Sequence, residues 1–165
     1  MIFVTVGTHE QGFERLVKEI DKIAESGELF ENIKIQIGYT SYIPKNCEWK
    51  KFVSYDEMER NIEEASIIVT HGGPASFLQP LQHGKIPIVV PRQKKFNEHV
   101  NDHQLEFVRV VEKELGNILV VENVEDLRNT ILKYDSLIKN MGTKCVSHNA
   151  EFIRMFEKSV NEIMK

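Results

Sequence analysis

The segment from Ile67 to Arg92 constrains the fold more strongly than any other part of the chain. It reads IIVTHGGPASFLQPLQHGKIPIVVPR: an apolar run ends at Thr-His-Gly-Gly-Pro, a short helical pattern follows, and a second apolar run ends at Pro-Arg. This order predicts strand, glycine turn, helix and strand, which is a βαβ unit. Its glycines fall at the carboxyl end of the first strand, the edge at which open α/β sheets bind ligands.

The rest of the chain repeats this alternation of strand and helix. Short apolar runs predict further strands at Ile2–Val6, Ile33–Ile37, Trp49–Val53 and Ile118–Val121. A helical apolar period predicts helices over about Phe13–Ala24, Ser54–Ala65, Asn97–Leu115, Val124–Leu137 and Ser147–Met164. We therefore expect an α/β fold: a single Rossmann-like domain with a doubly wound, mostly parallel sheet.

Length and composition limit the classes of function. The 165 residues suffice for one domain, spanning 1–165, with its own hydrophobic core. A formal net charge of −4 disfavours nucleic acid as a partner, because such binders present a basic surface. The only cysteines, Cys47 and Cys145, are far apart, which indicates a reducing, cytoplasmic compartment. No stretch approaches the roughly 20 apolar residues of a spanning helix, so we expect any membrane association to be peripheral.

Two glycine turns follow predicted strands and carry the first candidate site residues. These are Gly7-Thr8-His9 and the turn formed by His71, Gly72, Gly73, Pro74, Ala75 and Ser76. Each turn would place backbone N–H groups at a helix N-terminus, where a phosphate oxygen binds readily. Pro74 suits the first turn of a helix, since its missing N–H costs nothing there. The alternative is that the glycines merely turn the chain.

Two further features, a histidine and a polar cluster, also fit a pocket, and each has a plainer alternative. His71 at a strand end could bind a diphosphate or a sugar, or it could be satisfied by backbone groups. A polar cluster at a predicted helix start lies at the mouth of the same cleft, or is simply a solvated helix terminus; it comprises Asn97, Glu98, Asn101, Asp102, His103 and Gln104. His99 and His103, four residues apart on that helix, could ligate a metal, although no HExxH motif accompanies them.

Several common site motifs are missing from the sequence. It holds no GxGxxG dinucleotide fingerprint, no GxxxxGK[ST] phosphate loop and no GxSxG elbow. It also holds no Asp-x-Asp pair, which metal-dependent nucleotide-sugar enzymes often use. We therefore expect no metal and no cofactor.

The runs FVTVGTHEQGFERLV, VTHGGPAS, GKIPIVVPR and NEHVNDHQ together resemble the donor-binding, C-terminal-type domain of GT-B glycosyltransferases of family 28. The resemblance covers essentially the whole chain. It is nearest to the small chain of two-chain bacterial capsule and exopolysaccharide β-1,4-galactosyltransferases. The catalytic subunit of the dolichol-linked N-acetylglucosaminyltransferase is similar as well.

The resemblance implies half of a larger enzyme. In this family two Rossmann-like domains face each other across a cleft, one binding UDP-sugar and the other a lipid-linked acceptor. It thus implies a membrane-associated, acceptor-binding glycosyltransferase chain as partner, at the inner face of the plasma membrane. It places Gly7, Thr8 and His9 near the diphosphate or the cleft, His71, Gly72, Gly73, Ala75 and Ser76 in the phosphate turn, and Asn97, His99, Asn101, Asp102, His103 and Gln104 near the donor sugar.

Gln79 departs from the family pattern. Many related transferases carry a Glu at this position, five residues before Gly84 in the following turn, where its carboxylate holds the ribose hydroxyls. A glutamine can still hydrogen-bond ribose, but without the strength of a charge-assisted bond. Donor binding is therefore expected to be weaker, or to need the partner.

These observations support one main hypothesis and two alternatives. In the first, the chain binds UDP-galactose and a lipid-linked sugar is galactosylated, with His9 as the local candidate for the base. In the second, the chain is a non-catalytic activator of a separately active transferase. The third, a complete small UDP-sugar enzyme, is disfavoured because half of the cleft would be missing. The C-terminal helix, with Phe152, Met155 and Phe156, is a candidate docking surface, or simply covers the sheet.

Overall fold

A computed structural model describes residues 1–141 and residue 158 of the chain. Within them lies one parallel sheet of six strands in the order β3-β2-β1-β4-β5-β6. The strands are β1 (Ile2–Thr5), β2 (Ile33–Gln36), β3 (Glu48–Lys50), β4 (Ile67–His71), β5 (Ile88–Val90) and β6 (Leu119–Val120). This is the doubly wound topology expected from the sequence. The chain adds β2 and β3 on one side of β1 and then β4, β5 and β6 on the other, so the strand order reverses between β1 and β4.

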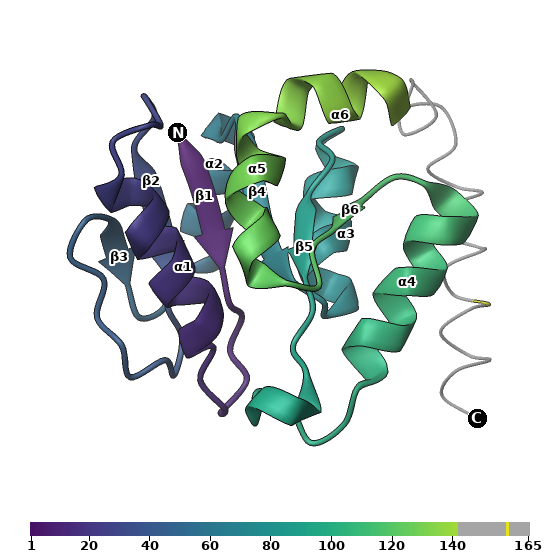
Figure 1. Ribbon diagram of the computed structural model, residues 1–165, viewed down its shortest axis with the longest axis horizontal. Helices are drawn as coiled ribbons and strands as arrows, with labels where there is room; N and C mark the ends of the chain where they lie inside the picture. The colour runs from purple at the N-terminus through teal and green to yellow at the C-terminus, as the bar shows by residue number, and fades with distance from the viewer. Residues whose placement is uncertain (142–157, 159–165) are drawn as a thin grey trace.

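Helices cover both faces of the sheet, with α1 and α5 in front and α2 and α3 behind in the view of Figure 1. The α-helices are α1 (Glu14–Glu25), α2 (Tyr55–Glu64), α3 (Pro74–Gln82), α4 (His103–Leu115), α5 (Leu127–Leu132) and α6 (Tyr134–Met141). Two short 3-10 turns, η1 (Lys94–Phe96) and η2 (Val124–Asp126), precede α4 and α5. No helix in the described part of the chain is both long and apolar enough to cross a membrane.

The core has two layers because the strands are apolar on both sides. Ile2, Val4 and Val69 point toward α1 and α5 in the larger cluster. Phe3 and Ile68 point the other way and pack on Ile62 of α2. The first apolar run is thus a strand buried on both faces, as a continuous apolar run of this length indicates.

The segment 97–102 is the main difference from the predicted helices, because α4 begins at His103 rather than at Asn97. Asn97 adopts a left-handed conformation with φ 56°. The Glu98 side chain turns inward and accepts a hydrogen bond from the Gln93 N–H, at 3.1 Å. These contacts hold the segment as a loop. His99 therefore does not share a helix face with His103, and the helical spacing that suggested a metal pair is not present.

Two smaller differences concern element boundaries. The third strand is Glu48–Lys50 rather than Trp49–Val53, since Ser54 already caps α2 by accepting the Glu57 N–H. The predicted helix 124–137 is broken after Leu132, where the buried Tyr134 turns inward and its hydroxyl donates to the Ile86 carbonyl at 2.6 Å. The predicted helix 147–164 and its docking residues lie outside the described residues.

Candidate functional site

The site is a cavity of about 510 Å³ at the carboxyl edge of the sheet, at the point where the strand order reverses. Both glycine turns, the start of α3 and the inner side of α2 enclose it. Nine of the predicted site residues line it: Gly7, Thr8, His9, His71, Gly73, Ala75, Ser76, Gln79 and Gln104. The volume lies within the range of small-molecule sites.

The two glycine turns meet at the imidazole ring of His71. A Cβ on Gly7 would overlap Nε2 of that ring, and a Cβ on Gly73 would overlap its Cε1. Gly7 also has φ 76°, which side-chain-bearing residues rarely adopt. Both glycines are thus required by the close approach of His71, a reason that the sequence alone did not reveal.

Both nitrogens of His71 are used inside the protein. Nδ1 accepts the Gly73 N–H at 3.0 Å, so Nε2 carries the proton and donates to the Ser76 hydroxyl at 2.5 Å. Burial, reinforced by the charge of Arg92, lowers the pKa of His71 to about 3, so the ring is neutral. His71 therefore positions Ser76, whose own hydroxyl hydrogen remains available to a ligand.

The N-terminus of α3 opens into the cavity. No side chain of the described residues caps this helix. The Gly73 N–H is taken by His71 and the Ser76 N–H by the Gly73 carbonyl. Among the described residues this leaves the Ala75 N–H, the Ser76 hydroxyl and the positive end of the helix dipole facing the cavity, an arrangement that suits an anion.

Gln79 lines the cavity one turn further along α3, and its amide is held from behind. Its Nε2 donates a short hydrogen bond to Glu59 of α2, and His83 contacts the other oxygen of that carboxylate at 3.1 Å. A carboxylate only accepts, so the Gln79 amide nitrogen must face Glu59. Its carbonyl oxygen is then the atom left to accept a ligand hydroxyl.

His9 and the loop 97–102 form one rim of the site. The His9 ring stacks on His99 with ring centroids 4.7 Å apart, and its Nε2 contacts Gln11 at 2.9 Å. Burial and the neighbouring His9 lower the pKa of His99. His99 is thus in contact with a cavity residue although it does not line the cavity itself.

The remaining predicted residues lie outside the cavity lining. Gly72 is buried against Pro91 and Gln104. Asn97 and His103 are exposed, while the Asn101 side chain accepts the His103 N–H and that of Asp102 accepts the Lys94 N–H. The last four of these residues shape the loop 97–102 and the start of α4.

Arg92, at the end of β5, joins the turns of the site and was not predicted to have this role. It is fully buried, and its guanidinium donates to the backbone carbonyls of Val6, Gln11, Gly12 and Glu98, at 2.7–3.2 Å. Burial lowers its pKa to about 10, so it stays charged. It also stacks over the Phe13 ring at 4.7 Å. Arg92 thereby fixes the loop after β1 relative to the loop after β5.

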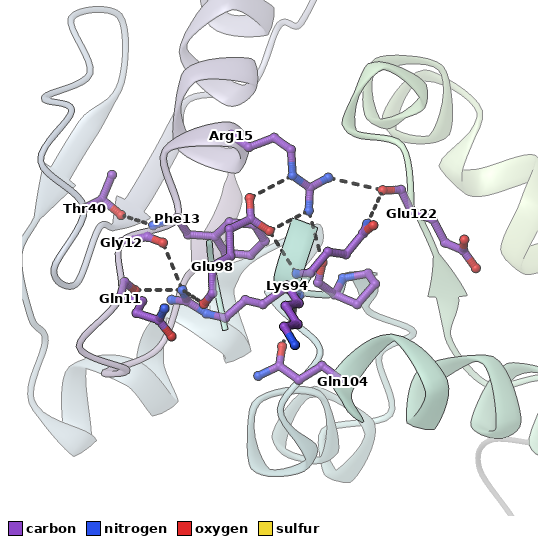
Figure 2. Close-up of polar contacts among 12 residues, drawn as sticks. Gln11, Gly12, Phe13, Arg15, Thr40, Lys94, Glu98, Gln104 and Glu122 are labelled. Carbon is purple, nitrogen blue, oxygen red and sulfur yellow. Dashed lines mark hydrogen bonds and ion pairs between the residues drawn. The ribbon is translucent and has the colours of Figure 1, made fainter. Parts of the chain in front are cut away.

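Arg15 and Glu98 form a second layer of this network, shown in Figure 2. Arg15 binds both carboxylate oxygens of Glu98, at 2.8 and 2.9 Å, and also the carbonyls of Pro91 and Glu122. The paired, planar geometry makes this a strong contact. The one signal in the sequence for this network was a charged residue, Arg92, just after the apolar strand β5.

In the described part of the chain, histidine is the only residue type of the cavity lining that could carry a charge near neutral pH. Among the described residues, no Asp, Glu, Lys or Arg lines it, and no group of three or more His, Cys, Asp or Glu is placed to hold a metal ion. Negative charge in a ligand would be met by helix and turn N–H groups rather than by side-chain cations.

The model of the glycosyltransferase family 28 C-terminal domain matches residues 1–161. Two curated relatives carry the name UDP-N-acetylglucosamine transferase subunit ALG13. The human protein is 30% identical over 124 residues, and the mouse protein is 29% identical over 122 residues. In each case the match covers 68% of this chain but only 10% of the relative.

Solved structures share the fold. MurG of Acinetobacter baumannii superimposes with a TM-score of 0.60 at 19% identity, over 88% of this chain and 45% of the other. The glycotransferase of kitacinnamycin gives a TM-score of 0.60 at 18% identity, over 85% of this chain and 37% of the other. The chain therefore corresponds to somewhat less than half of these proteins.

Proposed function

The chain belongs to the glycosyltransferase family 28 C-terminal domain family, and we propose that it is the UDP-sugar-binding subunit of a two-chain glycosyltransferase. The observation that carries the proposal is the cavity at the carboxyl edge, where both glycine turns and the uncapped start of α3 converge. This edge is where open α/β sheets hold nucleotides.

The diphosphate is proposed to lie at the start of α3. The Ala75 N–H and the Ser76 hydroxyl would donate to its oxygens, while Gly7 and Thr8 close the opposite side. The absence of side-chain cations in the described lining fits binding by N–H groups and helix dipole. Further along α3, the Gln79 carbonyl would accept a hydroxyl of the nucleotide.

The same contacts would assist the transfer. An acceptor hydroxyl attacks the anomeric carbon with inversion, the bond from that carbon to the diphosphate oxygen breaks, and UDP leaves. The N–H groups and the hydroxyl at α3 stabilise the charge that develops on the leaving diphosphate, with no metal required. His9 is the local candidate for the base that takes the hydroxyl proton. A His9→Gln variant should then lose turnover while keeping UDP affinity; equal turnover would assign the base to the partner.

Two donors are to be compared directly. The sequence resemblance favours UDP-galactose and capsule or exopolysaccharide synthesis. The name of the human and mouse relatives favours UDP-N-acetylglucosamine. Calorimetry of each donor with the same protein sample decides between them, and equal affinity would leave the choice to the partner chain.

An acceptor-binding, membrane-associated partner chain is proposed to cover the carboxyl edge. Tyr39 and Phe52, which follow β2 and β3 at this edge, are 51% and 41% exposed and pack edge to face at 5.3 Å. Replacing both with Ser should abolish co-purification with the partner. Phe30→Ser is the matched control, because Phe30 is fully exposed but precedes β2 at the other edge.

The activity test is sugar transfer to a lipid-linked acceptor by the co-purified chains. We expect transfer to require this chain. Ala75→Pro removes the proposed phosphate-binding N–H and should reduce transfer strongly. If the partner transfers sugar without this chain and the chain only raises that rate, with the UDP-sugar bound by the partner and not by this chain, the chain is a non-catalytic activator instead.

A further inference from the structure

Three buried polar side chains stand side by side on the floor of the cavity. Gln36, Thr5 and Thr70 occupy adjacent strands β2, β1 and β4 and are register partners across them. All three are buried and all three line the cavity. The preceding residues on the same face, Phe3 and Ile68, are apolar core. Polar groups this deep are normally hydrogen-bonded, so their partners matter.

Two of the three side chains already have partners. Thr5 Oγ1 accepts the Gly7 N–H and the Gln36 amide, both at 3.2 Å, which occupies both of its lone pairs. Gln36 Oε1 accepts the Val53 N–H at 3.1 Å. The Thr5 hydroxyl hydrogen is therefore left to donate to an acceptor beyond this row.

Thr70 differs, because its hydroxyl has no hydrogen-bond partner among the described residues. It is fully buried with respect to solvent and lies against the cavity. A buried hydroxyl left unpaired destabilises the fold, whereas a valine of the same shape would not. The arrangement is thus one that a ligand completes.

The surroundings define what kind of group fits. Met58 and Ile62 of α2 and Pro80 of α3 form apolar walls beside the polar row, and no charged side chain of the described residues lines the cavity. A phosphate would be poorly solvated there, because it needs several donors. A flat, mostly apolar ring with one or two neutral polar atoms matches these walls and this floor.

We propose that Thr70 and Thr5 bind the nucleoside end of the donor, with the Thr70 hydroxyl contacting a neutral polar atom of the base or ribose. This rests on the proposed function, since it takes the diphosphate to lie at the start of α3. The Thr70 hydroxyl then contributes to the choice of nucleotide, and the sugar lies outside the inner cavity.

The test is Thr70→Val, which exchanges the hydroxyl for a methyl group at nearly constant volume. Calorimetry with UDP and an NMR titration with uridine should both show about tenfold weaker binding. Binding of inorganic pyrophosphate should be unchanged. Thr70→Ser restores the hydroxyl and most of the affinity. The control is Thr130→Val on α5, where the hydroxyl donates to the carbonyl of Asp126, the residue just before that helix.

Each other outcome overturns the assignment. UDP and uridine affinities within twofold of the wild-type values would show that the hydroxyl meets no ligand. Weaker binding of UDP-sugar alone would place the sugar, not the nucleoside, on the threonines. Comparison of UDP with 2′-deoxy-UDP tells ribose from base. If the ribose is the partner of Thr70, wild-type protein should bind 2′-deoxy-UDP more weakly than UDP, and Thr70→Val should bind the two equally.

Thermal unfolding without ligand gives an independent check. With the Thr70 hydroxyl unpaired, Thr70→Val should unfold at the same temperature as the wild type or higher. A lower temperature would mean that a structural water or protein group already satisfies the hydroxyl, and the proposal fails. If wild-type protein binds neither UDP nor uridine but Thr70→Val is not destabilised, the proposed function fails while the unpaired hydroxyl stands.

Discussion

The strongest stability prediction concerns Arg92→Met. The substitution keeps an unbranched side chain over the Phe13 ring but removes the guanidinium that bonds four backbone carbonyls. Each hydrogen bond to a charged group contributes roughly 1.5–3 kcal/mol, so four would sum to about 6–12 kcal/mol. The four bonds share one guanidinium and are not independent, so the loss on removing it is smaller than this sum.

Removing one partner of a buried charged contact typically costs about 3–5 kcal/mol, and this is the loss expected in the free energy of unfolding. Such a loss is a large part of the roughly 5–15 kcal/mol of an ordinary domain. The denaturation midpoint should fall by about 6–20 °C. Because the lost bonds fix the loop after β1, UDP affinity should fall as well, even in molecules that remain folded.

Urea unfolding followed by circular dichroism measures the loss, with Arg109→Met as the matched control. Arg109 also forms a paired contact with a carboxylate, Glu122, but its side chain is 55% exposed. An exposed ion pair contributes at most about 1 kcal/mol. The reasoning is refuted if Arg92→Met lowers the free energy of unfolding no more than Arg109→Met does, with the same dependence of that free energy on urea concentration. Arg92 would then not hold the loops of the site together.

Three further predictions concern His71 and its neighbours. Gly7→Ala should destabilise the fold by about 1–3 kcal/mol more than Gly84→Ala. Both glycines have positive φ, but only a Cβ on Gly7 would overlap the His71 ring. Equal losses of stability in urea unfolding would show that the His71 ring does not lie against Gly7. Burial lowers the pKa of His71 to about 3, so the folded state keeps the ring neutral. The contribution of His71 to the free energy of unfolding is therefore complete above about pH 6.5, the pKa of a histidine in the unfolded chain. Below that pH this contribution falls by up to about 1.4 kcal/mol per pH unit. His71→Gln should flatten the pH dependence of unfolding between pH 6.5 and 5, and an unchanged slope would count against it. The double variant Glu59→Gln with Gln79→Glu should keep or increase UDP affinity in calorimetry. Gln79→Glu alone should lower the affinity, because two carboxylates would then meet. If the double variant binds UDP no better than the single one, residue 79 does not contact the nucleotide.

The fold was largely predictable because its signals are local. Apolar runs too short for helices, separated by helical patterns, predicted the parallel sheet and its doubly wound topology, and the structure confirms both. The residue types at the start of α2 allowed a cap at Ser54 or at Asp56, and in the structure Ser54 accepts the Glu57 N–H. What could not be read was the start of α4, because the partner that turns Glu98 inward, Arg15, is distant in sequence.

The candidate site was predictable in its location but not in its internal contacts. Strand ends followed by glycines identified the edge and both turns. The sequence did not show that His71 itself makes Gly7 and Gly73 necessary, since that contact joins β1 to β4 across the sheet. Thr70 escaped notice for the same reason: within an apolar strand it reads as an ordinary β-branched residue until the cavity above it is known.

The central claim is that the cavity at the carboxyl edge binds the nucleotide of the donor. The most direct measurement is a titration of isotope-labelled protein with UDP, followed by backbone amide NMR. We expect the amide signals of Gly7, Gly73 and Ala75 to shift together with one dissociation constant, while those of Phe30 at the opposite edge stay in place. Absence of any shift at millimolar UDP, or shifts confined to residues away from these turns, would contradict the account.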